Sequence, residues 1–398
     1  MRERTIRPMA AAVTYEPFGR DTWRDPFPLY ARLRDEDPVH RSPLGFWVLS
    51  RFHDVWTAAR ETDTFSSAQG LTFRNEVEEL GLAPTIVMMD PPDQTRYRRL
   101  VNRGFTPRHV TELEGELRAF VSERIDALVA AGSGDFVAVV GEPTPNWVVS
   151  GYLGIPTEDR SKFGGWTSHI VQAAASGHGD GAPGAIAEMY AYFTELVERR
   201  KVERGDDLVS ILLDADDDGA GIGLEGILGY AFVMITGGND TATGLLAGAT
   251  ELLTTSPDER ARLIADPSLI PNAVEEFLRL TSPVQGLCRV ATRRVDIHDT
   301  TIAEGDRVLL CYGSGNRDPR QFGPDAEDLD VTRSVPQMLT FSSGAHFCLG
   351  AAAARMQGRV VIEELLRQCP DFAVDGQAGT FADGAFTRRY ASLPFSAS

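Results

Sequence analysis

A single cysteine stands in the stretch Phe341-Ser342-Ser343-Gly344-Ala345-His346-Phe347-Cys348-Leu349-Gly350. The residues after Cys348 are rich in strong helix formers, so this cysteine is expected in the first turn of a helix. Free backbone N–H groups and the helix dipole at such a turn favour the thiolate, which is the form of cysteine that binds a metal. Phe341 is well placed to shield the sulfur from water. The pattern therefore predicts a metal-ligating cysteine at a loop-to-helix junction.

Two glycines and a histidine surround this cysteine. Gly344 can adopt a backbone conformation that is closed to other residues, and Gly350 lets a flat group approach the chain closely. His346 lies two residues from Cys348. The remaining cysteines are isolated in the sequence, and we interpret them as buried, inert hydrophobic residues: Cys288, Cys311 and Cys369.

The pattern Phe-x-x-Gly-x-His-x-Cys-x-Gly resembles the haem-ligand loop of the cytochrome P450 superfamily, the haem-thiolate monooxygenases. Ser342 replaces the glycine that usually follows the phenylalanine. The resemblance implies a mainly α-helical, triangular domain with small β-sheets around a buried haem b, spanning residues 1–398 as one domain. It also implies that Cys348 ligates the iron and that Phe341 and Gly350 lie against the cofactor.

A long apolar helix is expected at residues 224–254, and its middle reads Met-Ile-Thr-Gly-Gly-Asn-Asp-Thr. Gly237 and Gly238 each cost about 1 kcal/mol relative to alanine inside a helix, so they need a reason, such as a ligand against the backbone. The Thr241 hydroxyl can bond the carbonyl one turn back and open the helix locally. Taken alone, the segment favours a simple helix kink. It resembles, however, the central-helix signature of the superfamily, which implies that Thr241 hydrogen-bonds the oxygen on the iron and that Asp240 relays protons to it.

A second helix is expected after Asp90-Pro91-Pro92-Asp93, where the prolines and acids are typical of a helix start. Gln94 and Arg98 are four residues apart and therefore lie on one face. In the superfamily these two positions meet a haem propionate, although many members have histidine in place of Gln94. The resemblance further implies that Arg289 and His346 bind the propionates, since buried carboxylates need such partners.

Glu276 and Arg279 are three residues apart on another expected helix, where they can pair through charge-assisted hydrogen bonds. They resemble the structural Glu-x-x-Arg pair of the superfamily. Its usual third partner is an arginine further along the chain, but the best-aligned position here is Asp328.

Two irregular segments are expected, a long loop at residues 65–89 and a glycine-rich loop at residues 174–184. The resemblance implies that the first covers the substrate and that the second is part of a lid over the pocket. The residues expected to line the pocket are apolar, which predicts an apolar substrate. They are Val87, Met88, Met234, Gly237, Val284 and Leu287.

Composition narrows the class of protein. A net charge of −18 speaks against nucleic-acid binding, and no apolar run is long enough for a signal peptide or a membrane anchor. Scattered cysteines without a C-x-x-C pair fit a reducing cytoplasm. Residues 94–111 contain no acid but five arginines. This stretch is either a solvated basic helix face or a docking patch for an acidic electron donor.

The resemblance implies a monooxygenase that inserts one oxygen atom from O2 into an apolar small molecule, by hydroxylation or oxidative dealkylation. We expect no fused flavin or iron-sulfur domain, so the electrons are expected from a ferredoxin and its NAD(P)H-dependent reductase. One alternative is a peroxide-driven peroxygenase, against which the Asp240-Thr241 pair argues. The other is a non-enzymatic haem gas sensor or carrier, which would have no need of a proton relay.

Overall fold

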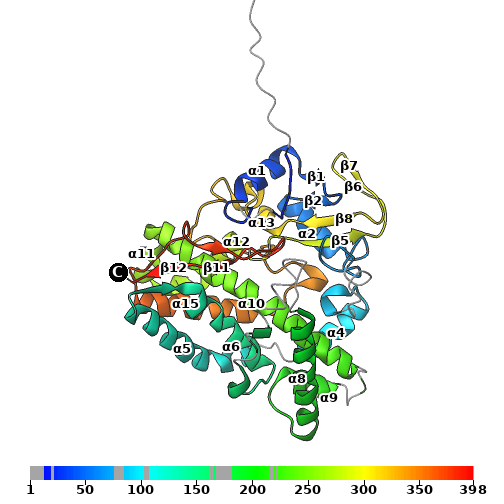
Figure 1. Ribbon diagram of the computed structural model, residues 1–398. Coiled ribbons are helices and arrows are strands. Elements are labelled where there is room, and N and C mark those ends of the chain that lie inside the picture. Colours follow the sequence, from blue (N-terminus) through cyan, green and yellow to red (C-terminus); the bar gives the residue numbers. More distant parts are fainter. Residues whose placement is uncertain are drawn as a thin grey trace, which may run out of the picture.

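The computed structural model describes residues 13–18, 22–75, 85–102, 107–160, 163, 165–166, 182–215, 219 and 222–397. Its longest helix, α10 (Gly223–Thr255), crosses the centre of the molecule (Figure 1). Residues 242–250 are all buried, as expected for a helix half that is apolar all round. Gly248 permits close packing there, because a Cβ at this position would lie 2.6 Å from Thr281 Cγ2.

Helices gather around α10 on one side of the molecule (Figure 1). The helices α6 (Pro143–Tyr152), α8 (Ala182–Val202), α12 (Ile270–Thr281) and α15 (Ala351–Gln368) all contact α10. Helix α15 also packs along α5 (Pro107–Ala130). Helices α5, α6, α10, α12 and α15 bury one large hydrophobic cluster, which fixes α15, and thus the residues just before it, relative to α10. Helix α8 packs into a second cluster with α10 and α9 (Leu208–Ala215).

A five-stranded sheet lies on the other side of the molecule, in the order β1-β2-β8-β5-β3 (Figure 1). Its strands are β1 (Val39–Arg41), β2 (Trp47–Leu49), β3 (Phe65–Ser66), β5 (Leu287–Ala291) and β8 (Arg307–Leu310). Strands β2 and β8 are parallel, and the other neighbours are antiparallel. The β3 strand pairs with β5 so that Ser66 lies opposite Val290. The sheet therefore brings residues near position 66 beside the strand that carries Arg289.

The remaining elements are short. The further α-helices are α1 (Phe27–Glu36), α2 (Phe52–Arg60), α4 (Asp93–Val101), α9 (Leu208–Ala215), α11 (Pro257–Ala265), α13 (Tyr312–Gly315) and α14 (Pro319–Phe322). Single turns of 3₁₀-helix are η1 (Ile86–Met88), η4 (Thr157–Asp159), η6 (Pro267–Leu269) and η7 (Gly344–His346), and η3 (Val137–Gly141) is a π-helix. The small sheets use β4 (Ser133–Asp135), β6 (Val295–Ile297), β7 (Thr300–Ile302), β9 (Ala373–Val374), β10 (Thr380–Phe381), β11 (Tyr390–Ser392) and β12 (Pro394–Ser396).

These elements confirm the prediction of a mainly helical fold with small sheets. The central helix begins and ends within one residue of its predicted bounds. None of the helices in the described ranges is long and apolar enough to cross a bilayer. Most of the predicted lid, at residues 174–181, lies outside the described residues.

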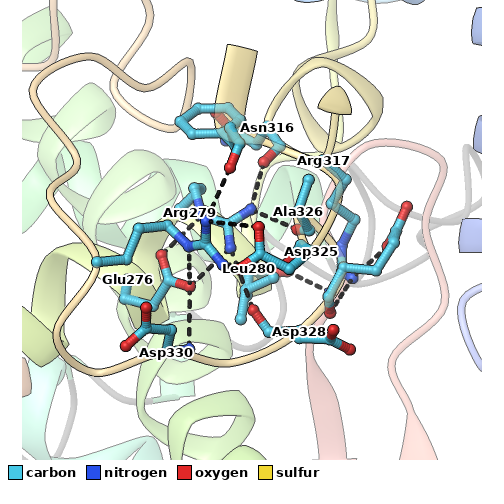
Figure 2. Close-up of polar contacts among 12 residues, drawn as sticks. Glu276, Arg279, Leu280, Asn316, Arg317, Asp325, Ala326, Asp328 and Asp330 are labelled. Carbon is cyan, nitrogen blue, oxygen red and sulfur yellow. Dashed lines mark hydrogen bonds and ion pairs between the residues drawn. The ribbon is translucent and has the colours of Figure 1, made fainter. Parts of the chain in front are cut away.

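A fully buried ion pair joins Glu276 and Arg279 on α12 (Figure 2). Arg279 donates Nε and Nη2 to the two carboxylate oxygens of Glu276, each over 2.7 Å. Its Nη1 donates to the carbonyls of Asn316 at 2.8 Å and Ala326 at 2.7 Å. Every nitrogen of this guanidinium therefore has a partner, which is the condition for burying a charge.

The expected third partner of this pair proves to be Arg333 rather than a residue at position 328. The Nε of Arg333 donates to Glu276 Oε1 over 3.1 Å, whereas Asp328 contributes only its carbonyl oxygen, 3.5 Å from Arg279 Nη2. The reason is a turn at Asp330, whose carbonyl accepts the N–H of Arg333 and bends the chain back toward Glu276. The arginine that completes the network thus lies five residues after Asp328, the position that best matched the motif in the sequence.

We expect Arg279→Ala to lower the free energy of unfolding by about 3–5 kcal/mol, because it leaves a buried carboxylate short of partners. Urea unfolding followed by circular dichroism measures this loss. The matched control is Arg294→Ala, because Arg294 and its partner Asp296 are exposed and their ion pair is expected to contribute nothing measurable. Equal midpoints for the two variants would contradict the structural role assigned to Arg279.

Candidate functional site

Cys348 lies between the single turn η7 and the start of α15, so the predicted loop-to-helix junction is present. The cysteine precedes the helix, which begins at Ala351, and is not in its first turn as expected. Its N–H donates to the carbonyl of Phe341 over 2.9 Å. Desolvation raises the pKa of the Cys348 thiol, and the backbone N–H groups of Gly350 and Ala351 and the guanidinium of Arg98 lower it by less. The predicted N–H groups thus reach the sulfur, but they do not by themselves favour the thiolate, because burial outweighs them. A bound metal ion would supply the missing positive charge, since a coordinating thiol is deprotonated.

The side chain of Cys348 is accessible even though desolvation dominates its pKa. Both observations hold if the sulfur faces a concave space inside the protein. Phe341 is buried beside it, and the Arg355 guanidinium lies 4.7 Å from the centre of the Phe341 ring. A Cβ on Gly350 would lie 3.8 Å from the sulfur.

The turn before the cysteine has two residues with positive φ. Gly344 has φ +68°, and a Cβ there would lie 3.3 Å from the Cα of Arg60 on α2, so the chain passes close to that helix. Ser342 has φ 56°, which explains why related loops carry glycine at this position. Its N–H donates to the carbonyl of Leu339 over 2.8 Å, and its hydroxyl lies 3.4 Å from Tyr312 Oη. These contacts hold a serine in a conformation that usually requires glycine.

Helix α10 offers two adjacent glycines with different surroundings. Gly237 is exposed in the middle of a central helix, and a Cβ there would meet no atom within 4 Å. A Cβ on Gly238 would lie 2.8 Å from Val149 Cγ2 on α6. Close packing against α6 is therefore sufficient to explain Gly238, and only Gly237 has the open surroundings that suit a ligand.

The Thr241 hydroxyl donates to the carbonyl of Gly237 over 2.9 Å, on the same open face of α10. The predicted bond is present, within a helix that runs from Gly223 to Thr255. Thr241 and Gly237 are four residues apart, which stacks them on one face of the helix.

Asp240 points to a different neighbour. Its Oδ1 lies 2.9 Å from Arg389 Nε, and Arg389 Nη1 donates to Glu142 Oε1 over 3.2 Å. Burial raises the pKa of Asp240, and the charge of Arg389 opposes this shift. Glu142 is half-exposed, so the three side chains lead from the middle of α10 toward the surface. Sequence reasoning missed Arg389, because nothing in the pattern near the end of the chain marks it as a partner of α10.

Three side chains that can carry positive charge gather beside the cysteine loop. Desolvation and the nearby Arg289 and Arg98 lower the pKa of His346 to about 3. Arg289 is buried, and its Nη1 donates to the carbonyl of its neighbour Cys288. Gln94 Nε2 and Arg98 Nη1 donate to the carbonyl of Ala345, over 2.6 and 3.0 Å.

No ion pair joins Arg98 or Arg289 to a carboxylate within the described ranges. Arg98 and Arg289 both lie close enough to His346 to lower its pKa, so an anion beside these two cations would be favoured. Haem b carries two carboxylates. The residues present therefore fit a haem whose carboxylates meet Arg98, Arg289 and His346 while its iron meets Cys348.

The residues predicted to line the pocket fall into two groups. Val87 and Met234 pack into the cluster between α8, α9 and α10, to which η1 also belongs. Met88 is buried in η1, which contacts α10. Val284 and Leu287 instead pack against the cluster of the five-stranded sheet. The structure thus does not gather all of them in one cluster.

A segment that sequence reasoning missed lies beside Val284. The carbonyl of Phe386 accepts the N–H of Gln285 over 2.7 Å, and the N–H of Arg388 donates to the carbonyl of Pro283 over 2.8 Å. A Cβ on Gly244 of α10 would lie 2.9 Å from the Arg388 carbonyl oxygen. The segment at residues 386–388 therefore lies between the sheet side and the central helix.

Comparisons with known proteins agree with this geometry. Residues 184–370 match the family model described as Cytochrome P450. Cytochrome P450 130 of Mycobacterium tuberculosis is 54% identical over 387 residues, which cover 94% of this chain and 96% of that protein. The vitamin D(3) 25-hydroxylase of Pseudonocardia autotrophica is 35% identical over 367 residues and covers 90% of each chain. The solved structure of cytochrome P450 CYP109Q5 from Chondromyces apiculatus has a TM-score of 0.88 at 32% identity, covering 97% of this chain and 98% of that one.

The chain therefore belongs to the cytochrome P450 family, whose members are oxidoreductases that bind haem b. The fold is that of the family.

Replacing single cysteines can show whether Cys348, rather than another free cysteine, ligates the iron. We expect Cys348→Ala to abolish the strongly red-shifted Soret band of the dithionite-reduced protein with carbon monoxide, because that band requires a thiolate ligand. Cys369→Ala removes a buried thiol at the far end of α15 and should leave the band in place. A red-shifted band in Cys348→Ala would show that another residue ligates the iron.

Proposed function

We propose that this protein inserts one atom of dioxygen into an apolar small molecule, by hydroxylation or oxidative dealkylation. The observation that carries the proposal is the pair Asp240 and Thr241 on α10. Thr241 stands on the open face beside Gly237, and Asp240 reaches toward the surface through Arg389. A haem that only carried a gas, or that took its oxygen from peroxide, would need no such pair.

When bound, haem supplies the iron centre that activates dioxygen, and the Cys348 thiolate favours cleavage of the O–O bond. The protein's part is to deliver protons. Thr241 Oγ1 can give up its bond to the Gly237 carbonyl and donate to the reacting oxygen. Asp240 then takes a proton from solvent, at the end of the path where it meets Arg389, and passes it toward Thr241. Its raised pKa lets the carboxyl hold a proton closer to neutral pH than a free aspartate can.

The proposed substrate is apolar because the expected lining is apolar on both sides: Val87 and Met234 from η1 and α10, and Val284 and Leu287 from the sheet side. The name of the 35% identical relative, vitamin D(3) 25-hydroxylase, is consistent with hydroxylation of such a molecule.

We infer that the electrons come from a ferredoxin and its NAD(P)H-dependent reductase, with the protein in the cytoplasm. Helix α4 supports this inference because its two faces differ. Gln94 and Arg98 turn inward to the cysteine loop, whereas Arg96 and Arg99 are exposed. An acidic ferredoxin could therefore meet positive charge close to Cys348. Arg103 and the side chain of Arg108 lie outside the described residues.

The proton relay can be tested by separating electron use from product formation. We expect Thr241→Ala to retain haem but to lower the ratio of product to NADPH consumed several-fold, with the missing electrons appearing as hydrogen peroxide. Thr250→Ala is the matched control, because its hydroxyl makes the same bond to the carbonyl four residues back but is fully buried. Unchanged coupling in Thr241→Ala would refute the relay.

The docking face can be tested by charge reversal. We expect Arg99→Glu to slow reduction by ferredoxin in stopped-flow measurements, and to do so more strongly at low salt, because exposed charges are screened as ionic strength rises. Arg294→Glu is the control, because it reverses another exposed arginine, which lies outside α4. If both variants are reduced at the wild-type rate, the ferredoxin docks elsewhere.

A further inference from the structure

Asp90, just before α4, holds a turn that is more than twenty residues away in the sequence. Its Oδ2 accepts the hydroxyl of Ser66 over 2.5 Å, and its Oδ1 accepts the N–H of Ser67 over 2.9 Å. The Ser66 oxygen in turn accepts the N–H of Ala68 over 3.0 Å. Both carboxylate oxygens and the Ser66 hydroxyl are thus used to fix this turn.

The Ser67 hydroxyl is left pointing at the cysteine loop. Its oxygen lies 3.3 Å from Nε2 of His346, and the Ser67 side chain is fully buried. Ser66 belongs to β3 and pairs with Val290, the neighbour of Arg289. The turn therefore lies among the groups that we assign to the haem carboxylates.

Asp90 also anchors the other side of the same loop. Its carbonyl accepts the N–H of Gln94 over 3.0 Å, which starts the helix α4. Gln94 and Arg98 then hold the carbonyl of Ala345, the residue before His346. One aspartate therefore connects two supports of the cysteine loop, one through Ser67 and one through α4.

We propose that Asp90 and Ser67 are positioning residues for haem, acting through His346. The Ser67 hydroxyl donates to Nε2 of the imidazole, which places the ring proton on Nδ1 and presents that N–H to a haem carboxylate. Asp90 keeps the Ser67 hydroxyl in place without touching the cofactor. Residues that hydrogen-bond to a cofactor-binding side chain fix its orientation, and removing them commonly lowers the affinity of the protein for the cofactor. The inference rests on the proposed role of His346 as a carboxylate ligand.

The first test compares holoenzyme variants by the rate at which haem passes to excess apomyoglobin. We expect Ser67→Ala to raise this rate about three- to ten-fold, the effect of one lost hydrogen bond. Asp90→Ala should also raise the transfer rate. In the Ser67→Ala background, Asp90→Ala should raise the rate by a smaller factor than in the wild type, because the two residues act through one contact. Should Asp90→Ala fail to fold, Asp90→Asn replaces it, since the amide keeps the acceptor for the Ser67 N–H and should give a smaller rise.

A second readout separates positioning from a general loss of stability. The bending modes of the haem carboxylates in resonance Raman spectra report their hydrogen bonds, so we expect Ser67→Ala and His346→Ala to shift the same band. The matched control is Ser42→Ala, which removes a buried hydroxyl bonded to the Tyr15 carbonyl over 3.1 Å. Ser42 directly follows β1, which is at the opposite edge of the five-stranded sheet from β3. This control variant should change neither the band nor the transfer rate.

The outcomes distinguish the inference from its premise. If His346→Ala alters both readouts while Ser67→Ala behaves like Ser42→Ala, the positioning role is overturned and His346 keeps its assignment. If His346→Ala alters neither readout, the carboxylate role of His346 fails and the inference fails with it. Strictly additive effects of Asp90→Ala and Ser67→Ala would overturn the link between these two residues.

Discussion

The buried ion pair of Glu276 and Arg279 sets the position of much that lies downstream. Both side chains are removed from water, so each needs a full set of partners. Arg279 finds two of them in backbone carbonyls, and one of these belongs to Asn316. The side chain of Asn316 in turn accepts the N–H of Leu339 over 2.7 Å, at the start of the stretch that leads to Cys348. The buried guanidinium of Arg279 needs hydrogen-bond partners, and these partners connect α12, through Asn316, to the stretch that leads to the cysteine loop.

Adjacent positions of the central helix α10 serve packing and chemistry. Gly238 and Gly248 lack a side chain because neighbouring helices come too close, whereas Gly237 lacks one where space is open. The polar residues Thr241 and Asp240 of α10 also lie on different sides of the helix. Thr241 stays on the open face with Gly237, and Asp240 turns away to Arg389. Because adjacent residues on a helix point about 100° apart, one acid and one alcohol can serve the outer and inner ends of a proton path.

The sequence was most informative where the structure is local. The loop around Cys348 could be recognised because its turn, its glycines and the following helix are contiguous, and so could the pairs at spacings of three and four on helices. It was uninformative where partners are far apart in the chain. Arg389 meets α10 about 150 residues away, Ser66 and Ser67 meet Asp90, and Arg333 rather than position 328 completes the Glu276 network. The two adjacent glycines also look identical in sequence, and only their neighbours distinguish them.

The positive groups beside the cysteine loop favour binding of the haem carboxylates. The chain is strongly acidic overall, yet Arg98, Arg289 and His346 stand together beside the cysteine loop without a described carboxylate. That arrangement is unfavourable for the protein alone, because repulsion and desolvation act on the same groups. The carboxylates of haem remove both penalties when they bind, so the cofactor stabilises the fold that holds it. The hydrogen bonds from Gln94, Arg98 and Ser67 fix the loop in advance, which leaves little for the cofactor to reorganise.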